Sequence, residues 1–201
     1  MVEKTCPICG KTPCTLFHLL NNCQTSVNQK RYDYRHDSIL LFLYNMLMET
    51  KDKTNLEIYA DLEGSRVNGV TIPNNIVTTG SKPDLVIINR STKKIDLVEL
   101  TVPWDTMANN AKKRKEARYN SLVTNIQNSG WTCSHTTLEI GSRGMITQRN
   151  KSSLVMLCNL ARETKKSKVI QTCSKLALLG SYSLYVARHS KDWMPGPLLQ
   201  P

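Results

Sequence analysis

The sequence has no long apolar run: no stretch approaches the roughly 20 residues that a helix needs to cross a bilayer. The first 25 residues are polar and contain cysteines, so no signal peptide is visible there. The absence of a signal peptide favours an intracellular, reducing compartment, in which clustered cysteines hold a metal more often than they form disulfides. Internal repeats and low-complexity tracts are also missing, so the 201 residues predict one globular core with a small appendage.

Acidic residues are scarce, because 16 Asp and Glu stand against 27 Lys and Arg, and the formal net charge is +11. A basic protein can simply carry solvated lysines. The same surplus of positive charge is also the electrostatic footprint of nucleic-acid binding. Charge alone does not distinguish DNA from RNA, or binding from cleavage.

The spacing of apolar residues predicts an α/β fold, in which helices flank a small mixed sheet. The core should run in the order helix, strand, strand, strand, helix, strand. The expected helices are 31–50, 105–128, 148–164 and 167–189, and the expected strands are 56–62, 83–89, 95–102 and 131–140. A polar break at 51–55 and an irregular loop at 64–81 separate some of these elements, and the tail from Pro195 is expected to be loose.

Two acids occupy the apolar strands of the central hairpin. Asp84 begins the first of these strands, and Glu99 lies between Val98 and Leu100 in the second. Side chains alternate along a strand, so Glu99 shares a face with Thr101, whereas Asp96 faces the other way. An unpaired buried carboxylate is costly, and a cation or a basic partner would remove that cost. We therefore predict that Asp84 and Glu99 converge on a divalent cation, with Asp96 as the lower-ranked second acid.

A lysine interrupts the apolar stripe of the helix expected at 105–128. Lys115 falls among the stripe residues Ala108, Ala111, Tyr119, Leu122, Val123 and Ile126, with Lys112 between two of them and Arg118 at the rim. Lysine avoids a position that faces a sheet unless an anion lies there. Glu99, Asp84 or a substrate phosphate would supply that anion. A purely structural ion pair, or a lysine extended outward along the helix, are the alternatives.

Four metal-ligand residues lie close together near the N-terminus. Cys6, Cys9, His18 and Cys23 have the spacing C-x₂-C-x₈-H-x₄-C, and Cys14 is a spare candidate. Three thiolates and one imidazole suit a structural, tetrahedral Zn²⁺, which would fold a segment too short to fold alone. The alternative is a coincidental group of buried thiols. Three isolated cysteines, Cys133, Cys158 and Cys173, are expected to be ordinary thiols.

These motifs together resemble the PD-(D/E)XK nuclease superfamily, whose core runs αβββαβ. They resemble more closely the restriction-like endonuclease domain of site-specific non-LTR retrotransposons. In that domain a CCHC zinc knuckle precedes an Arg-His-Asn/Asp helix start, a Pro-Asp strand, an acidic strand and a Lys-x-x-Lys/Arg-Tyr helix. The matching segments after the knuckle are Arg35-His36-Asp37, Lys82-Pro83-Asp84, Glu99-Leu100-Thr101 and Lys115-Glu116-Ala117-Arg118-Tyr119. The match spans roughly residues 6–145.

The resemblance implies a zinc knuckle (1–30), a restriction-endonuclease-like core (31–145) and a C-terminal helical extension (146–201). It also implies that Asp84, Glu99 and a carbonyl near Leu100 hold Mg²⁺ or Mn²⁺, and that Lys115 orients water or stabilises the transition state. One departure is Thr101, which stands where the superfamily usually has lysine; the retroelement branch carries its lysine on the next helix. Supporting roles would fall to His36, Lys112, Arg118 and Tyr119, and nucleic-acid contacts to Arg35, Lys113, Arg114 and Arg143.

Three functions stay open at this stage. The first is an endonuclease domain of a retroelement that nicks target DNA to expose a primer, with DNA, a reverse transcriptase domain or element RNA as partners and a nuclear location. The second is a non-catalytic nucleic-acid-binding module on a decayed nuclease fold, which Thr101 keeps open. The third is a free-standing nuclease for branched DNA. The chain has no room for a polymerase, so it is expected to be a terminal fragment or a separate reading frame.

Overall fold

A four-stranded mixed sheet forms the centre of the molecule in the computed structural model, which describes residues 4–49, 55–66 and 71–200. The strands are β1 (Glu57–Ala60), β2 (Leu85–Asn89), β3 (Lys94–Thr101) and β4 (Thr132–Glu139), in that order across the sheet. The first three pair in antiparallel fashion, and β4 runs parallel to β3. A parallel pair needs a crossover, and α4 (Ala108–Asn128) supplies it.

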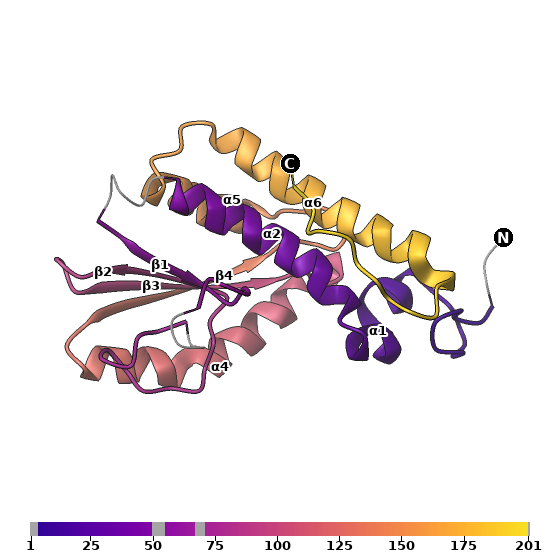
Figure 1. Ribbon diagram of the computed structural model, residues 1–201, viewed down its shortest axis with the longest axis horizontal. Helices are drawn as coiled ribbons and strands as arrows, with labels where there is room; N and C mark the ends of the chain where they lie inside the picture. Colours follow the sequence, from indigo (N-terminus) through magenta and orange to yellow (C-terminus); the bar gives the residue numbers. More distant parts are fainter. Residues whose placement is uncertain (1–3, 50–54, 67–70, 201) are drawn as a thin grey trace.

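Helices cover both faces of the sheet (Figure 1). One face packs against α2 (Arg31–Met48), α5 (Gln148–Leu160) and α6 (Lys166–Val186), and the other face packs against α4. Shorter helical turns are η1 (His18–Asn22), α1 (Gln24–Asn28), η2 (Asp105–Met107) and η3 (Ala187–His189). The predicted α/β class, a mixed sheet flanked by helices, is therefore confirmed.

Strand β2 shows why the sheet has two cores. Four of its five residues are buried, because alternate side chains enter opposite layers. Leu85 and Ile87 pack beneath α2, α5 and α6, whereas Val86 and Ile88 pack against α4. The predicted boundary between a nuclease core and a C-terminal extension at 145/146 falls within the first of these cores, since α5 and α6 share it with α2.

Most predicted elements appear with shifted ends. The helix expected from 105 begins with the 3₁₀ turn η2 and becomes α-helical at Ala108. The helix expected to reach 164 ends at Leu160, because Arg162 adopts a left-handed backbone with φ of 51°. Of the predicted polar break at 51–55, only Asn55 lies within the described residues, and the predicted loop at 64–81 is described without 67–70.

The tail beyond Pro195 was predicted to be loose, and the structure corrects this. The backbone N–H of Leu199 donates to Ser38 Oγ at 3.1 Å, and the Tyr34 hydroxyl donates to the Pro197 carbonyl at 3.3 Å. The Leu199 side chain packs against the core beneath α2 and α6. Sequence composition indicated a Pro-rich coil but contained no signal for these docking contacts.

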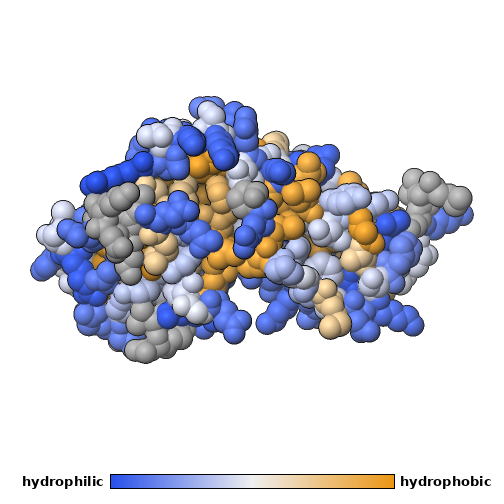
Figure 2. All heavy atoms as spheres, turned by 45° about the horizontal axis from the view of Figure 1, so that its top comes forward, coloured by the Kyte–Doolittle hydropathy of each residue, from blue (hydrophilic) through white to orange (hydrophobic). Residues whose placement is uncertain are grey.

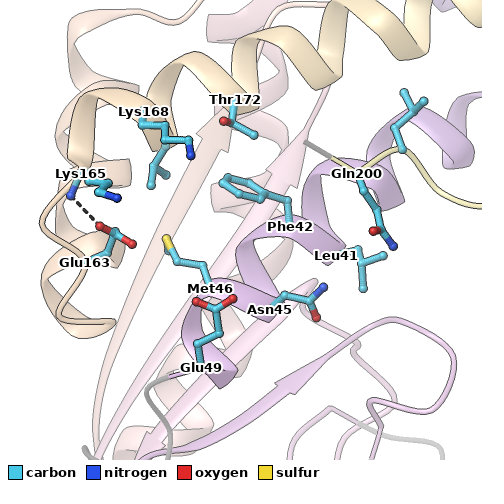
Figure 3. Close-up of a pocket in the computed structure, with 12 residues that line it drawn as sticks. Leu41, Phe42, Asn45, Met46, Glu49, Glu163, Lys165, Lys168, Thr172 and Gln200 are labelled. Atoms are coloured by element: carbon cyan, nitrogen blue, oxygen red, sulfur yellow. Dashed lines mark hydrogen bonds between the residues drawn. The ribbon is translucent and has the colours of Figure 1, made fainter.

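Apolar side chains gather in the middle of the face on which α2 and α6 lie (Figure 2). A cavity of about 390 Å³ lies between α2, the α5–α6 connection and the tail. Phe42 and Met46 from α2 line it, with Glu163, Lys165 and Lys168 contributed by the α5–α6 side (Figure 3). None of the predicted site residues lines this cavity. Among the described residues, no helix is both long and apolar enough to span a bilayer.

Candidate functional site

The two predicted acids lie together at one end of the β2–β3 pair. Asp84 directly precedes β2, whose Leu85 pairs with Val98, so Asp84 comes opposite Glu99. The Asp84 N–H donates to Glu99 Oε2 at 3.3 Å, and the Leu100 N–H donates to Asp84 Oδ2 at 2.8 Å. Both residues are buried, at 8% and 1% exposure. Register and hydrogen bonding therefore hold two carboxylates at one point.

Lys115 of α4 reaches the two acids from the sheet face that α4 covers. Its ammonium donates to Glu99 Oε1, while the hydroxyl of Tyr119, one turn further along α4, donates to the Lys82 carbonyl at 3.1 Å. Burial, followed by the charge of Asp84, raises the pKa of Glu99 despite the opposing effect of Lys115. The lysine therefore does not fully compensate the two buried carboxylates, and the site favours a further positive charge.

His36 of α2 supplies one such charge. Its Nε2 lies 3.3 Å from Asp84 Oδ2 and 3.2 Å from the Leu100 carbonyl oxygen, and its Nδ1 lies 2.8 Å from Asp37 Oδ1. Burial alone would lower the pKa of His36, but the charges and hydrogen bonds of Asp84 and Asp37 outweigh it and raise the pKa to about 10. The imidazolium thus contacts Asp84 and the Leu100 carbonyl, two of the three groups that were predicted to hold a metal.

The oxygen atoms gathered here suit a hard divalent cation. Carboxylates and a backbone carbonyl are the donors that Mg²⁺ and Mn²⁺ prefer. Asp84, Glu99 and the Leu100 carbonyl supply them. The competing acid Asp96 pairs with Lys94 at 3.0 Å and accepts from Ser134, on the opposite strand face.

A cleft of about 560 Å³ lies between the end of β3, α2 and the start of α4, and Asp84 and Glu99 are not among its lining residues. His36, Leu100 and Lys115 line it, and so does Arg114. The other predicted basic residues lie nearby on α4: Lys113 is exposed, Lys112 pairs with Glu116 at 3.5 Å, and Arg118 stacks 5.6 Å from the ring centre of Tyr119. Of the two predicted phosphate contacts on α4, Arg114 is therefore better placed than Lys113.

Arg35, which was predicted to contact nucleic acid, has a buried side chain, at 2% exposure, although it is among the residues that line the cleft. Its guanidinium donates to the carbonyls of Leu20 and Val102, both at 3.1 Å, and to Ser181 Oγ at 2.8 Å. A Cβ on Gly180 would lie 2.7 Å from Arg35 Cγ, so α6 approaches α2 closely here. Arg35 therefore ties the N-terminal module, the end of β3 and α6 together.

Arg143 remains at the surface, with its side chain 48% exposed. It pairs with Asp105 at 2.8 Å, and its guanidinium lies 4.4 Å from the ring centre of Trp104. Trp104 lines the cleft, so Arg143 stands next to the cleft rather than within it.

A further buried acid, Glu139, was missed by the sequence reasoning. Glu139 is 2% exposed, lies opposite Thr101 in the β3–β4 register, and pairs with Arg149 of α5. Asn150 donates to the Glu139 carbonyl and accepts from its N–H, so the start of α5 closes the outer edge of β4. The signal was present, since Glu139 lies between Leu138 and Ile140 just as Glu99 lies between two apolar residues.

Cys6, Cys9, His18 and Cys23 form a compact group whose ligand atoms all lie within 4.8 Å of one another. Neighbouring ligand atoms around tetrahedral Zn²⁺ are about 3.3 to 3.8 Å apart, as bonds of about 2.0 to 2.3 Å require. His18 Nε2 lies 3.2 Å from Cys9 Sγ. Cys14, although buried nearby, is outside the group. The four residues are thus close enough to bind a metal such as zinc.

The local backbone presents these ligands. The turn after Cys6 closes through a hydrogen bond from the Gly10 N–H to the Cys6 carbonyl at 2.8 Å, and the hydroxyl of Tyr32 accepts from the Cys23 N–H at 2.9 Å. Burial would raise the pKa of Cys23, but hydrogen bonds from Ser26 and the neighbouring thiols outweigh it and lower the pKa. The pKa of Cys9 is raised, mainly by burial. All seven cysteines lie within the described residues, and none of them forms a disulfide there.

No protein-family model matches this chain, and a search of curated proteins finds no match either. Membership of a nuclease family therefore stays a prediction from the motifs. Function must be inferred from the geometry of the acid pair, the cleft and the cysteine-histidine group.

Proposed function

We propose that this chain is a metal-dependent DNA endonuclease with a restriction-like αβββαβ core, acting as the target-nicking domain of a retroelement. The observation that carries the proposal is the contact network at the end of β2 and β3. There Asp84, Glu99 and Lys115 come from three separate elements and meet within hydrogen-bonding distance. In this network two buried acids lie side by side, and each has one basic partner: Lys115 pairs with Glu99, and His36 with Asp84.

The metal site would consist of Asp84, Glu99 and the Leu100 carbonyl. When bound, Mg²⁺ would supply positive charge for the scissile phosphate and make a water molecule easier to deprotonate. Lys115, held by Glu99 at the wall of the cleft, would orient the attacking water or stabilise the negative charge that develops on the phosphate. The expected products are a 3′-hydroxyl and a 5′-phosphate.

The surrounding residues would position the substrate and the acids. Arg114 faces the cleft and can contact a backbone phosphate. The imidazolium of His36 fixes Asp84 from the α2 side, and Arg35 holds the end of β3 through the Val102 carbonyl. A net charge of +11 would raise the local concentration of DNA. The zinc-binding group would fold the N-terminal module against this same end of the sheet, where Asn21 donates to the Val102 carbonyl.

The second candidate is a non-catalytic module on a decayed nuclease fold, and Thr101 is the observation that favours it. Its hydroxyl is buried without a hydrogen-bond partner among the described residues, at the position where the superfamily usually has lysine. Thr101 and Glu99 lie on the same strand face, toward α4. Lys115 reaches that face from α4, so the positive charge is retained although its position in the sequence has moved.

Moving the lysine from position 115 to position 101 tests whether Lys115 replaces the lysine that the superfamily usually has at the position of Thr101. Lys115→Met is expected to lower Mg²⁺-dependent nicking of supercoiled plasmid about a hundredfold or more, as removal of one electrostatic group does in other active sites. The double variant Lys115→Met/Thr101→Lys should recover part of that loss, because the new ammonium faces the same layer as Glu99. Nicking rates are measured by gel electrophoresis in Mg²⁺ and Mn²⁺.

Lys113→Met is the matched control, since Lys113 is exposed on the same helix and does not line the cleft. Thermal unfolding of each variant separates lost chemistry from lost folding. Wild-type protein that binds DNA in a salt-dependent way but never cuts it, at any Mg²⁺ or Mn²⁺ concentration, would establish the decayed module instead. Preferential cutting of branched over plain duplex DNA would indicate the branched-DNA nuclease.

A further inference from the structure

A groove of about 600 Å³ lies between the N-terminal cysteine-histidine module and α6, and we call it the α6 groove. The module contributes Leu16 and Leu19, and α6 contributes Leu178, Tyr182 and Tyr185. The two tyrosines are 64% and 41% exposed. Two large aromatic side chains thus stand open to solvent on one face of one helix, next to the module.

Cations flank these aromatic side chains. Arg143 and Arg188 line the α6 groove, and no Asp or Glu is among its lining residues in the described parts of the chain. The Arg188 guanidinium lies 4.0 Å from the ring centre of Tyr185. Aromatic faces interleaved with guanidinium groups match the alternation of bases and phosphates in single-stranded nucleic acid. Arg143 also pairs with Asp105, which does not line the α6 groove.

The α6 groove and the cleft lined by His36 and Lys115 share a wall. Phe17 and Trp104 both line the cleft, and their rings meet edge to face at 5.7 Å. On the groove side, Arg143 stacks on the ring of Trp104. A strand that leaves the cleft therefore needs to pass only this aromatic wall to reach Tyr182 and Tyr185. This continuity favours DNA from the cutting site as the occupant.

We propose that the α6 groove binds an unpaired strand of the DNA substrate. Bases would stack on Tyr182 and Tyr185, and phosphates would lie near Arg143 and Arg188. The inference rests on the proposed endonuclease function only for the origin of the strand. Binding itself depends on the groove residues and is measurable without cleavage.

The test measures the affinity of a fluorescein-labelled 20-nucleotide oligothymidylate by anisotropy, with every variant built on Asp84→Asn so that no strand is cut. Tyr182→Ala/Tyr185→Ala should weaken binding about tenfold or more, because base stacking on an aromatic side chain is lost. Tyr182→Phe/Tyr185→Phe keeps both rings and should stay within about twofold of the parent. Arg188→Ala should weaken binding and lower its salt dependence more than Lys175→Ala, which removes an exposed charge of α6 outside the groove.

Three outcomes would overturn the proposal. Unchanged affinity in the tyrosine-to-alanine variant excludes stacking in the α6 groove. Tighter, tyrosine-dependent binding of a 20-nucleotide oligouridylate would make RNA the occupant. Unchanged DNA binding with loss of self-association in sedimentation would make the groove a contact between copies of the chain. Tyrosine-dependent DNA binding by a protein that never nicks plasmid would support the groove and remove only the endonuclease proposal.

Discussion

Replacing Asp84 with asparagine is expected to lower Mg²⁺-dependent plasmid nicking by at least about a thousandfold, the upper range for a single electrostatic group in an active site. Asparagine keeps the shape of the side chain, and its amide oxygen can still accept from the Leu100 N–H. The substitution removes the charge, and with it the main reason for a divalent cation to bind beside Glu99. Nicked and supercoiled plasmid are quantified over time at saturating Mg²⁺.

The matched control for this experiment is Asp96→Asn. Asp96 is a second buried acid in the same strand as Glu99, but it pairs with Lys94 and Ser134 on the other face. Its replacement should leave the nicking rate within a few fold of wild type, whatever it does to stability. Nicking that persists in Asp84→Asn, or disappears in Asp96→Asn while the protein stays folded, would assign the chemistry to other residues.

Removing one ligand of the cysteine-histidine group is expected to have the second large effect. Purified wild-type chain should contain one zinc ion per molecule by atomic absorption, and Cys23→Ser should contain almost none. Binding of structural zinc contributes about 10 to 16 kcal/mol in small zinc modules, so its loss should unfold the N-terminal module. Hydrogen exchange should then rise in residues 4–29, while the β-sheet amides stay protected.

Cys14→Ser separates metal loss from the loss of a buried thiol. Cys14 is 7% exposed and lies beside the group, but its sulfur is not among the four clustered ligand atoms. This variant should keep its zinc and its protection from exchange. A wild-type chain without zinc whose N-terminal module is nevertheless protected would show that the four residues are merely buried neighbours.

The spacing of apolar residues predicted the sheet and its helices because each helix or strand has its own apolar face, which is visible in its own segment of sequence. The stripe on α4 contains Tyr119, Leu122 and Ile126, and these residues are buried against the sheet. The position of Lys115 inside that stripe was visible for the same reason, since an ammonium on an apolar face is conspicuous in any helical projection. Alternation along β3 likewise placed Glu99 and Asp96 on opposite faces.

Contacts between segments that lie far apart in the sequence could not be predicted from apolar periodicity. Arg35 was expected to contact nucleic acid because of its place in the Arg-His-Asp motif, yet it precedes Ile39 and Leu43 at intervals of four. That spacing places it on the buried face of α2, and its partners Leu20, Val102 and Ser181 come from three other parts of the chain. Local patterns do not encode such partners, and the docking of the tail through Leu199 was missed for the same reason.

The electrostatics of the acid pair also required coordinates. The sequence placed Asp84 and Glu99 on two neighbouring strands but did not show that His36 would contact both Asp84 and the Leu100 carbonyl. This contact makes α2 part of the site, and Arg35, one residue earlier, anchors the same turn to Val102. The geometry therefore links the helix start and the acidic strand, which sequence matching treated as separate motifs.

The most direct test of the metal site is a crystal structure of the wild-type chain soaked in Mn²⁺, with anomalous diffraction used to locate the ion. The account predicts an anomalous peak within about 2.0 to 2.4 Å of Asp84, Glu99 and the Leu100 carbonyl, as oxygen ligands of such ions require. A chain saturated with Mn²⁺ that has no peak at these oxygens, or has its only peak elsewhere, would contradict the account.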